Sequence, residues 1–209
     1  MQYGIVGAGE IGGAFAVRLV DAGHQVVIAN SRGPETLAPL VERLGPLARA
    51  ATVAEAATAG EIVVVAVPFF RHRELPPEPF AGRIVVDTNN YDIYRDPRDP
   101  RLDRGETTSG QLLAGHLPQA RIVKAFNTIW YRRILQEGRP GSPLSERLAV
   151  PIAGDDPAAK EAVARLAEEL GFAPVDNGTL ADSRRQEYGT PVFNKPAGPA
   201  EIAALLQLT

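Results

Sequence analysis

The sequence contains no cysteine, one methionine and one tryptophan, and aromatic residues make up only 6% of its 209 residues. Without cysteine the chain can form no disulfide, no thiolate zinc site and no cysteine nucleophile. The histidines are His24, His72 and His116, and they lack the spacing of a metal site. We therefore expect neither a bound metal nor thiol chemistry.

Long apolar runs and blocks of like charge are missing as well. No stretch reaches the roughly eighteen apolar residues of a transmembrane helix, and strand-like sequence already starts at Gln2, which leaves no room for a signal peptide. The formal net charge is −3, without a cluster of one sign that would attract nucleic acid or an anionic membrane. These absences predict a cytoplasmic, globular protein with no nucleic-acid or membrane partner.

Strand-like and helical segments alternate along the chain. Apolar, β-branched runs predict strands at 2–6, 25–29, 47–51, 61–67, 83–87, 121–125, 148–153 and 172–175. Periodic segments predict helices at 11–20, 34–44, 52–57, 108–114, 129–137, 157–170 and 200–206. Such alternation is typical of βαβ units, so we expect an α/β fold with a doubly wound, mainly parallel sheet and right-handed crossovers. Residues 61–67 (EIVVVAV) are apolar throughout, as expected for a central parallel strand.

Two segments stand apart from this alternation. Residues 91–107 (YDIYRDPRDPRLDRGET) are charged, contain two prolines and show no period, which predicts a long exposed loop. Residues 138–143 form a Gly/Pro/Ser connection, after which a last strand–helix–strand unit follows.

A glycine-rich turn lies between the first predicted strand and the first predicted helix. It consists of Gly7, Ala8, Gly9, Glu10, Ile11 and Gly12 and has the G-x-G-x-x-G spacing of a dinucleotide fingerprint. In this context the tight turn and the helix N-terminus can hold a pyrophosphate. The alternative is a glycine-rich turn without a nucleotide.

The residues at the end of the second predicted strand indicate which dinucleotide the protein binds. Eighteen residues past Gly12, where NAD enzymes usually carry an acid, the chain reads Asn30-Ser31-Arg32. An acid would bind the ribose 2′-OH of NAD and repel a 2′-phosphate, whereas an amide, a hydroxyl and a guanidinium favour the phosphate. The turn therefore predicts NADP(H), although the same residues also suit a solvated turn.

Polar and aromatic residues follow the central strands where ligands bind in open α/β sheets. Val67 and Pro68 end the fourth predicted strand, and their loop should lie along the nicotinamide ribose. Phe69 and Phe70 come next and either shape a flat hydride-transfer site or cover the sheet edge. His72 is a candidate catalytic residue that could protonate a reduced product or bind an anionic group, unless it is merely solvated.

Two asparagines are candidates for the nicotinamide side of the cofactor. Asn89 follows the fifth strand beside Thr88, where these residues either bond the cofactor or cap a turn. Asn127 follows the sixth strand and is the better candidate there for lining the site, because Lys124 lies within a buried strand and is expected to be structural. Asp155 or Asp156 is expected to cap the helix at 157–170.

With these motifs in place, the sequence resembles the NADPH-dependent F-420 reductase family, the F-420:NADP oxidoreductases and their bacterial relatives. It is also similar to the cytoplasmic NADPH-binding domain of the STEAP metalloreductases. The matching stretches are GIVGAGEIGGAFA, SRGPETL, VVVAVPF, KAFNTI, PIAGDDPAAKEAV and VDNGTLADSRRQEYGTPVF. They are collinear and span nearly the whole chain.

The resemblance implies a Rossmann NADP(H)-binding domain at 1–143, with a small C-terminal α/β extension at 144–209 that is packed on the same unit and helps cover the cleft. It assigns the pyrophosphate to Ala8–Ile11, the 2′-phosphate to Ser31 and Arg32, and the nicotinamide ribose to Ala66, Val67 and Pro68. It also implies a homodimer.

The activity implied by the resemblance is hydride transfer between NADPH and coenzyme F-420. FMN, FAD or a smaller acceptor stays open, because the loop at 91–107 has no counterpart in the deazaflavin-reducing pattern. Two further hypotheses are reduction of a small imine or carbonyl and a non-catalytic NADPH sensor. The first is disfavoured because such reductases add a long helical domain, for which too few residues follow Pro143.

Overall fold

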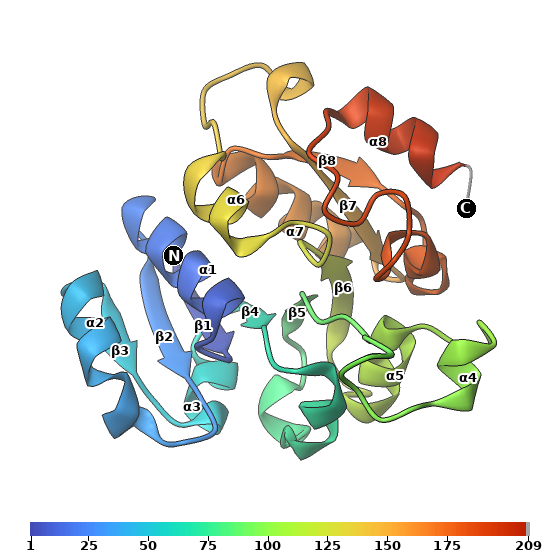
Figure 1. The fold of residues 1–209 in the computed structure, drawn as a ribbon. Helices are drawn as coiled ribbons and strands as arrows, with labels where there is room; N and C mark the ends of the chain where they lie inside the picture. Colours follow the sequence, from blue (N-terminus) through green and yellow to red (C-terminus); the bar gives the residue numbers. More distant parts are fainter. Residues whose placement is uncertain (208–209) are drawn as a thin grey trace.

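An eight-stranded sheet runs through the protein in the computed structural model, which describes residues 1–207 (Figure 1). The strands are β1 (Gln2–Val6), β2 (Gln25–Ala29), β3 (Ala48–Ala50), β4 (Ile62–Val65), β5 (Ile84–Asp87), β6 (Arg121–Ala125), β7 (Ala149–Gly154) and β8 (Ala173–Asp176). Their order across the sheet is β3-β2-β1-β4-β5-β6-β7-β8. All neighbouring strands are parallel except β6 and β7, which are antiparallel. The predicted Rossmann-type, mainly parallel α/β fold is confirmed.

Helices cover both faces of this sheet. The α-helices are α1 (Glu10–Asp21), α2 (Ala38–Leu44), α3 (Val53–Thr58), α4 (Pro100–Asp103), α5 (Ser109–His116), α6 (Tyr131–Gln136), α7 (Pro157–Glu169) and α8 (Pro199–Leu206). Shorter 3₁₀ segments are η1 (Pro34–Leu37), η2 (Phe69–Glu74), η3 (Glu78–Phe80), η4 (Leu144–Glu146) and η5 (Leu180–Gln186). Within residues 1–207, no helix has the length and apolar character needed to cross a membrane.

Side chains alternate between two apolar clusters because successive strand residues point to opposite faces. Ile5 and Val64 pack with α1, α6 and α7, whereas Val6, Val63 and Val65 pack with α3 and α5. Both faces of β1 and β4 are therefore covered, as the continuous apolar run at 61–67 indicates.

Local signals explain where several helices begin. Thr52 and Glu55 form the capping box of α3, with each side chain satisfying a backbone N–H of the other residue. Asp156 caps α7 by accepting from the Ala159 N–H, while Asp155 instead accepts from the Leu180 N–H. The helix expected from Pro34 starts as η1 and becomes α-helical only at Ala38.

The C-terminal segment joins the sheet rather than forming a separate layer. β7 pairs with β6, and Phe172 packs edge-on against Phe126 with ring centroids 5.7 Å apart. α8 closes a smaller apolar cluster that includes Ile202 and Leu206. The division at residues 143 and 144 stays a prediction.

The strand order reverses beside β1, which lies between β2 and β4. Crossovers on the two sides lead away from each other, so a crevice opens at the carboxyl ends of β1 and β4. β4 ends at Val65, two residues before the predicted end, and Ala66 to Pro68 therefore line this crevice instead of continuing the strand.

The segment 91–107 is mostly exposed, as predicted, but side-chain hydrogen bonds order it. It contains α4 and buries Tyr91 and Asp96. The Tyr91 hydroxyl donates to Asp103 and accepts from the Asp99 N–H, while Asp96 accepts from the Asp92 N–H. Because these bonds are local and made by side chains, they leave no periodic pattern in the sequence.

Candidate functional site

The crevice contains two adjoining cavities. The first cavity, of about 300 Å³, is lined by Val6, Gly7, Ala8, Gly9, Asn30, Ser31, Arg32, Val53, Ala66, Val67, Pro68, Arg71, Glu74, Leu75 and Pro76. The second cavity, of about 370 Å³, is lined by Gly9, Glu10, Ile11, Ala66, Val67, Pro68, Thr88, Asn89, Asn90 and Arg95. Gly9 and Ala66–Pro68 line both, so the two cavities form one elongated cleft that suits a dinucleotide.

The glycines of the fingerprint shape this cleft in different ways. Gly7 has a φ of +108°, and a Cβ there would collide with the Ala66 carbonyl. A Cβ on Gly12 would collide with the Gly7 carbonyl, so this glycine allows α1 to pack closely on the turn. A Cβ on Gly9 would meet no protein atom within 4 Å. Gly9 therefore leaves open the space at the N-terminus of α1 where a pyrophosphate would approach the backbone.

Asn30, the first residue of the turn after β2, stabilises this turn through its side chain. Asn30 accepts from the Arg32 N–H at 2.9 Å and donates to the Thr36 hydroxyl at 2.8 Å. Its side chain thus stabilises the turn, while Ser31 and Arg32 face the first cavity. Within residues 1–207, the Arg32 guanidinium has no hydrogen bond and no ion pair, so all its donors are available to an anion.

The opposite wall of the first cavity carries charges that the sequence analysis did not assign. Arg71 and Glu74, both on η2, form an ion pair, and Arg71 Nη1 also donates to the Ser31 hydroxyl at 3.1 Å. The hydrogen bonds with Arg71 hold the pKa of the Glu74 carboxyl below its usual value. Their sequence signal is weak, because only the fold brings η2 next to a turn forty residues earlier.

Asn89 projects into the second cavity from the end of β5. Its Oδ1 accepts from the Val67 N–H at 3.0 Å, which fixes the loop after β4. Its Nδ2 is buried and has no partner within residues 1–207. A buried amide donor without a partner is costly, so this group fits a carbonyl or hydroxyl of a bound ligand.

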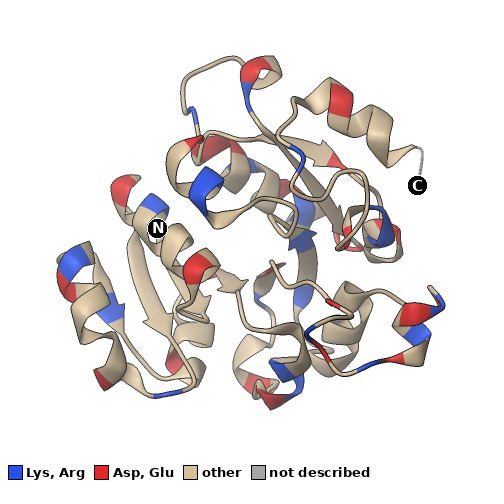
Figure 2. Ribbon diagram, viewed as in Figure 1, with Lys and Arg blue, Asp and Glu red and all other residues tan. Residues whose placement is uncertain are grey.

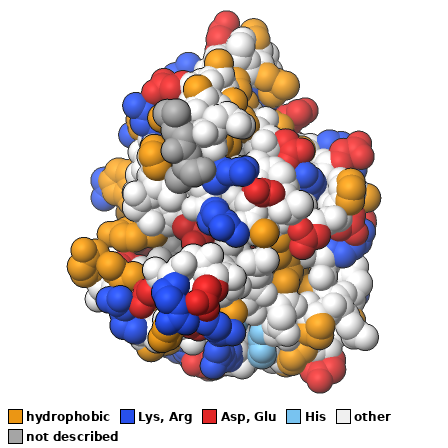
Figure 3. Space-filling view, turned by 90° about the vertical axis from the view of Figure 1, so that its right-hand side faces the viewer, with side chains coloured by type: hydrophobic (Ala, Val, Ile, Leu, Met, Phe, Trp, Pro, Cys, Tyr) orange, Lys and Arg blue, Asp and Glu red, His pale blue; other side chains and the backbone are white. Residues whose placement is uncertain are grey.

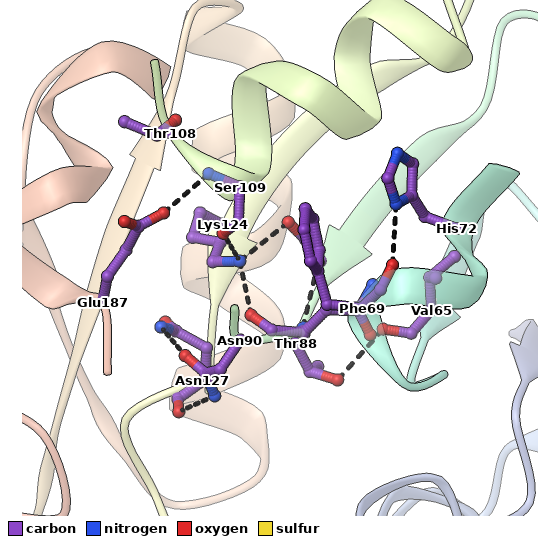
Figure 4. A network of polar contacts seen from close by, with 12 residues as sticks. Val65, Phe69, His72, Thr88, Asn90, Thr108, Ser109, Lys124, Asn127 and Glu187 are labelled. Carbon is purple, nitrogen blue, oxygen red and sulfur yellow. Dashed lines mark hydrogen bonds and ion pairs between the residues drawn. The ribbon is translucent and has the colours of Figure 1, made fainter. Parts of the chain in front are cut away.

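A buried lysine holds the backbone beneath this asparagine. Lys124 is fully buried on β6, pairs with Asp87 at 3.0 Å and donates to the Ser109 hydroxyl at 2.9 Å and to the Asn89 carbonyl. Figure 4 shows Lys124 directed toward Ser109, inside the protein. The expectation that Lys124 is structural agrees with these contacts.

Asn127 lies at the same edge of the sheet but does not line either cavity. Its Nδ2 donates to Asn90 Oδ1 at 2.9 Å and to the Gln186 carbonyl at 2.7 Å, and its Oδ1 accepts from Gln186 Nε2 at 3.0 Å. Because all these groups are satisfied, Asn127 links the C-terminal segment to Asn90, which does line the cleft (Figure 4). Direct cofactor binding by Asn127 stays a prediction.

His72 also lies outside the cleft. It is 5% exposed, stacks on Phe69 with ring centroids 4.7 Å apart, and lines a separate cavity with Phe70, Arg73 and Arg98. Nδ1 lies 2.7 Å from the Phe69 carbonyl and must carry the proton, because a carbonyl only accepts (Figure 4). The structure therefore does not bring His72 together with Asn89, and its catalytic role stays a prediction.

The buried position of His72 has a consequence for pH. Burial lowers the pKa of the imidazole below its usual 6.5, so the unfolded state binds the proton more readily. We expect the contribution of His72 to stability to be complete above pH 6.5 and to fall as the pH drops through 6.5 toward the lowered pKa. An NMR titration should give a pKa below 6.5, and His72→Asn should weaken the fall in melting temperature on acidification. A pKa above 6.5 would contradict this expectation.

The fold and the cleft are typical of a dinucleotide-binding oxidoreductase. Comparison with known proteins shows which family the N-terminal part of the chain matches. The family model for "NADP oxidoreductase coenzyme F420-dependent" matches residues 2–91. The chain is 34% identical to metalloreductase STEAP3 from Rattus norvegicus over 190 residues, which make up 89% of this chain and 36% of that protein. The chain thus spans little more than a third of this curated relative.

Solved structures agree with this assignment. A hypothetical protein from Sinorhizobium meliloti has a TM-score of 0.82 and 34% identity, with 95% of both chains covered. A protein from Arthrobacter sp. FB24, assigned as an F420-dependent NADP reductase, has a TM-score of 0.73 and 27% identity, with 87% of this chain and 86% of that one covered. Residues 2–91 thus match the coenzyme F420-dependent NADP oxidoreductase family, and the chain as a whole is similar to these two solved structures.

Proposed function

We propose that the protein transfers hydride between NADPH and a flat acceptor, coenzyme F-420 or a flavin such as FMN or FAD. The observation that carries this proposal is the cleft itself. One end offers the Arg32 guanidinium beside the Ser31 hydroxyl, and the other offers Asn89 Nδ2; neither group has a partner within residues 1–207. NADPH, when bound, supplies the hydride.

The residues of the cleft would bind and orient rather than exchange protons. Ser31 and Arg32 would hold the 2′-phosphate, the turn at Gly9 would hold the pyrophosphate, and Ala66 to Pro68 would lie along the nicotinamide ribose. Asn89 would donate its free Nδ2–H to the nicotinamide end. Glu10 and Arg95 are the only ionisable residues that line the second cavity within residues 1–207. Such a site supports ring-to-ring hydride transfer, which depends on positioning more than on a protein acid or base.

Aromatic surface near the cleft supports a flat acceptor. Trp130 follows β6 and is 47% exposed, with the Arg132 guanidinium 4.8 Å from its ring centroid. Trp130 precedes α6, which packs against α1, and Glu10 at the start of α1 lines the second cavity. An exposed indole in this position can stack on a planar ring.

The direct test is turnover with purified protein. We expect NADPH oxidation with F-420, FMN or FAD, and much slower oxidation of NADH. Binding of NADPH without oxidation by any of these acceptors would instead support an NADPH sensor, and equal affinity for NADH would remove the basis of the NADP(H) assignment.

Arg32→Ala should weaken NADPH binding about 10- to 100-fold and leave NADH binding unchanged, because a charge-assisted hydrogen bond contributes about 1.5–3 kcal/mol. Titration of each nucleotide measures both affinities. Arg43→Ala is the matched control, since Arg43 is exposed in the last turn of α2, away from the cleft. An unchanged preference for NADPH in Arg32→Ala would contradict the role of this residue.

We further propose that residues 1–143 form the NADP(H)-binding domain and that residues 144–209 form an extension that closes the cleft. We also propose that the protein is a cytoplasmic homodimer. Two hydrogen bonds support this closure: Gln186 Nε2 donates to Asn127 Oδ1, and the Ser109 N–H donates to the Glu187 carboxylate. Sedimentation analysis tests the dimer.

A further inference from the structure

Two segments far apart in sequence meet over the first cavity. Ser31 belongs to the turn after β2, and Arg71 and Glu74 belong to η2, which follows β4. Arg71 Nη1 donates to the Ser31 hydroxyl at 3.1 Å, and Arg71 Nε donates to the Glu74 carboxylate at 2.9 Å. The hydroxyl assigned to the 2′-phosphate is therefore already in contact with a second guanidinium.

Arg71 has donors left for a ligand. A guanidinium carries five N–H groups, and the hydrogen bonds of Arg71 to Glu74 and Ser31 use one on Nε, one on Nη2 and one on Nη1. One N–H on each Nη remains without a partner within residues 1–207. The side chain is 37% exposed at the cavity wall, so these two groups are accessible to a phosphate that contacts Ser31.

Glu74 places a negative charge in the same wall, and its carboxylate binds the guanidinium that a phosphate would bind. A ribose 2′-hydroxyl leaves this ion pair undisturbed, whereas a 2′-phosphate must share Arg71 with Glu74 or displace it. The ion pair is exposed on both sides and hence weakly held. The acid therefore weakens NADPH binding without preventing it.

We propose that Arg71 is a third ligand of the NADP(H) 2′-phosphate, beside Ser31 and Arg32, and that Glu74 is a counter-ion that holds Arg71 in place and limits the affinity for this phosphate. This inference rests on the proposed function of the cleft. It assigns specificity for the donor to two segments of the chain instead of one.

The test compares NADPH with NADH, and 2′,5′-ADP with 5′-AMP, by calorimetric titration. Arg71→Ala should weaken the binding of NADPH and 2′,5′-ADP about tenfold and leave the affinities for NADH and 5′-AMP within about twofold of the parent, because only the phosphate contact is lost. The NADPH affinity of Arg71→Lys should lie between those of the parent and Arg71→Ala, since lysine keeps the charge but lacks the planar fork of donors. Glu74→Gln should tighten NADPH about threefold to tenfold, because it removes a like charge in a largely solvated site.

Arg73→Ala is the matched control. Arg73 is exposed on the same η2 segment but lines the separate cavity beside His72, so its loss should change none of the four affinities. Unfolding curves of all variants confirm that each protein is folded.

The outcomes separate the inference from the function on which it rests. If the parent protein binds NADPH and NADH equally, the proposed function fails. If the parent prefers NADPH and Arg71→Ala keeps the full preference, only the role of Arg71 is overturned. If Glu74→Gln lowers the affinity for NADPH, alone or together with the affinity for NADH, then Glu74 does not limit phosphate binding. That part of the inference is then overturned.

Discussion

Gly9→Ala should fold like the parent protein and yet bind NADP(H) about a hundredfold more weakly, a loss equal to about one strong charge-assisted hydrogen bond. Gly9 has a φ of −79°, which alanine adopts without strain, and its added Cβ would meet no protein atom within 4 Å. The methyl group would instead occupy the space that the pyrophosphate needs at the N-terminus of α1. Thermal unfolding and NADPH titration of the same preparation separate the two effects.

Two other glycines provide the comparison for this variant. Gly13→Ala, one turn further into α1, also meets no atom within 4 Å and should keep both stability and affinity. Gly12→Ala should unfold the protein, because its Cβ would collide with the Gly7 carbonyl. Unchanged NADPH affinity in Gly9→Ala would show that the cleft is not the cofactor site.

Lys124→Met should lower the free energy of unfolding by about 3–5 kcal/mol, since it leaves the Asp87 carboxylate buried without a counter-charge. The two side chains are 0% and 1% exposed and lie 3.0 Å apart. Denaturant unfolding measures the loss. Adding Asp87→Leu to Lys124→Met should restore part of the stability, because an apolar pair needs no charge compensation.

A surface pair gives the contrast. Arg165 and Glu161 on α7 are also paired, with side chains 64% and 71% exposed, and Arg165→Ala should change stability by no more than about 0.5 kcal/mol. If Lys124→Met were equally mild, the buried network below Asn89 would not be the rigid support that its contacts indicate.

The strands and the fingerprint could be predicted because their signals are local. The apolar run at 61–67 indicates burial on both faces, and it forms the centre of the sheet as β4. Gly7 to Gly12 and the turn at Ser31 were located by spacing alone, and the cleft brings them together. In each case a few neighbouring residues carry the whole physical argument.

Contacts between distant segments could not be predicted from the sequence. The bonds between Asn127 and Gln186, fifty-nine residues later, are one example, and cofactor binding by Asn127 stays a prediction. Arg71 lies near Ser31 only after the β4 crossover has been folded. Residues 91–107 are mostly exposed, as their charges indicate, but the sequence does not predict which of these charges pair with each other. No sequence window contains this information.

Residues 91–107 supply their own counter-ions. Within the segment, Arg95 pairs with Asp96, Arg98 with Asp103, Arg101 with Asp99 and Arg104 with Glu106. Basic and acidic residues accordingly alternate around α4 and lie intermixed on the surface of this side of the molecule (Figures 2 and 3). Only Arg95 reaches the second cavity.

A segment that carries its own counter-ions can be exchanged as a cassette, since its removal strands no charge on the rest of the protein. The segment borders the second cavity through Arg95, while the residues that we propose to select the donor lie in the turn after β2 and on η2. If the proposed function holds, replacement of this cassette would alter the acceptor end of the cleft and leave the preference for NADPH unchanged.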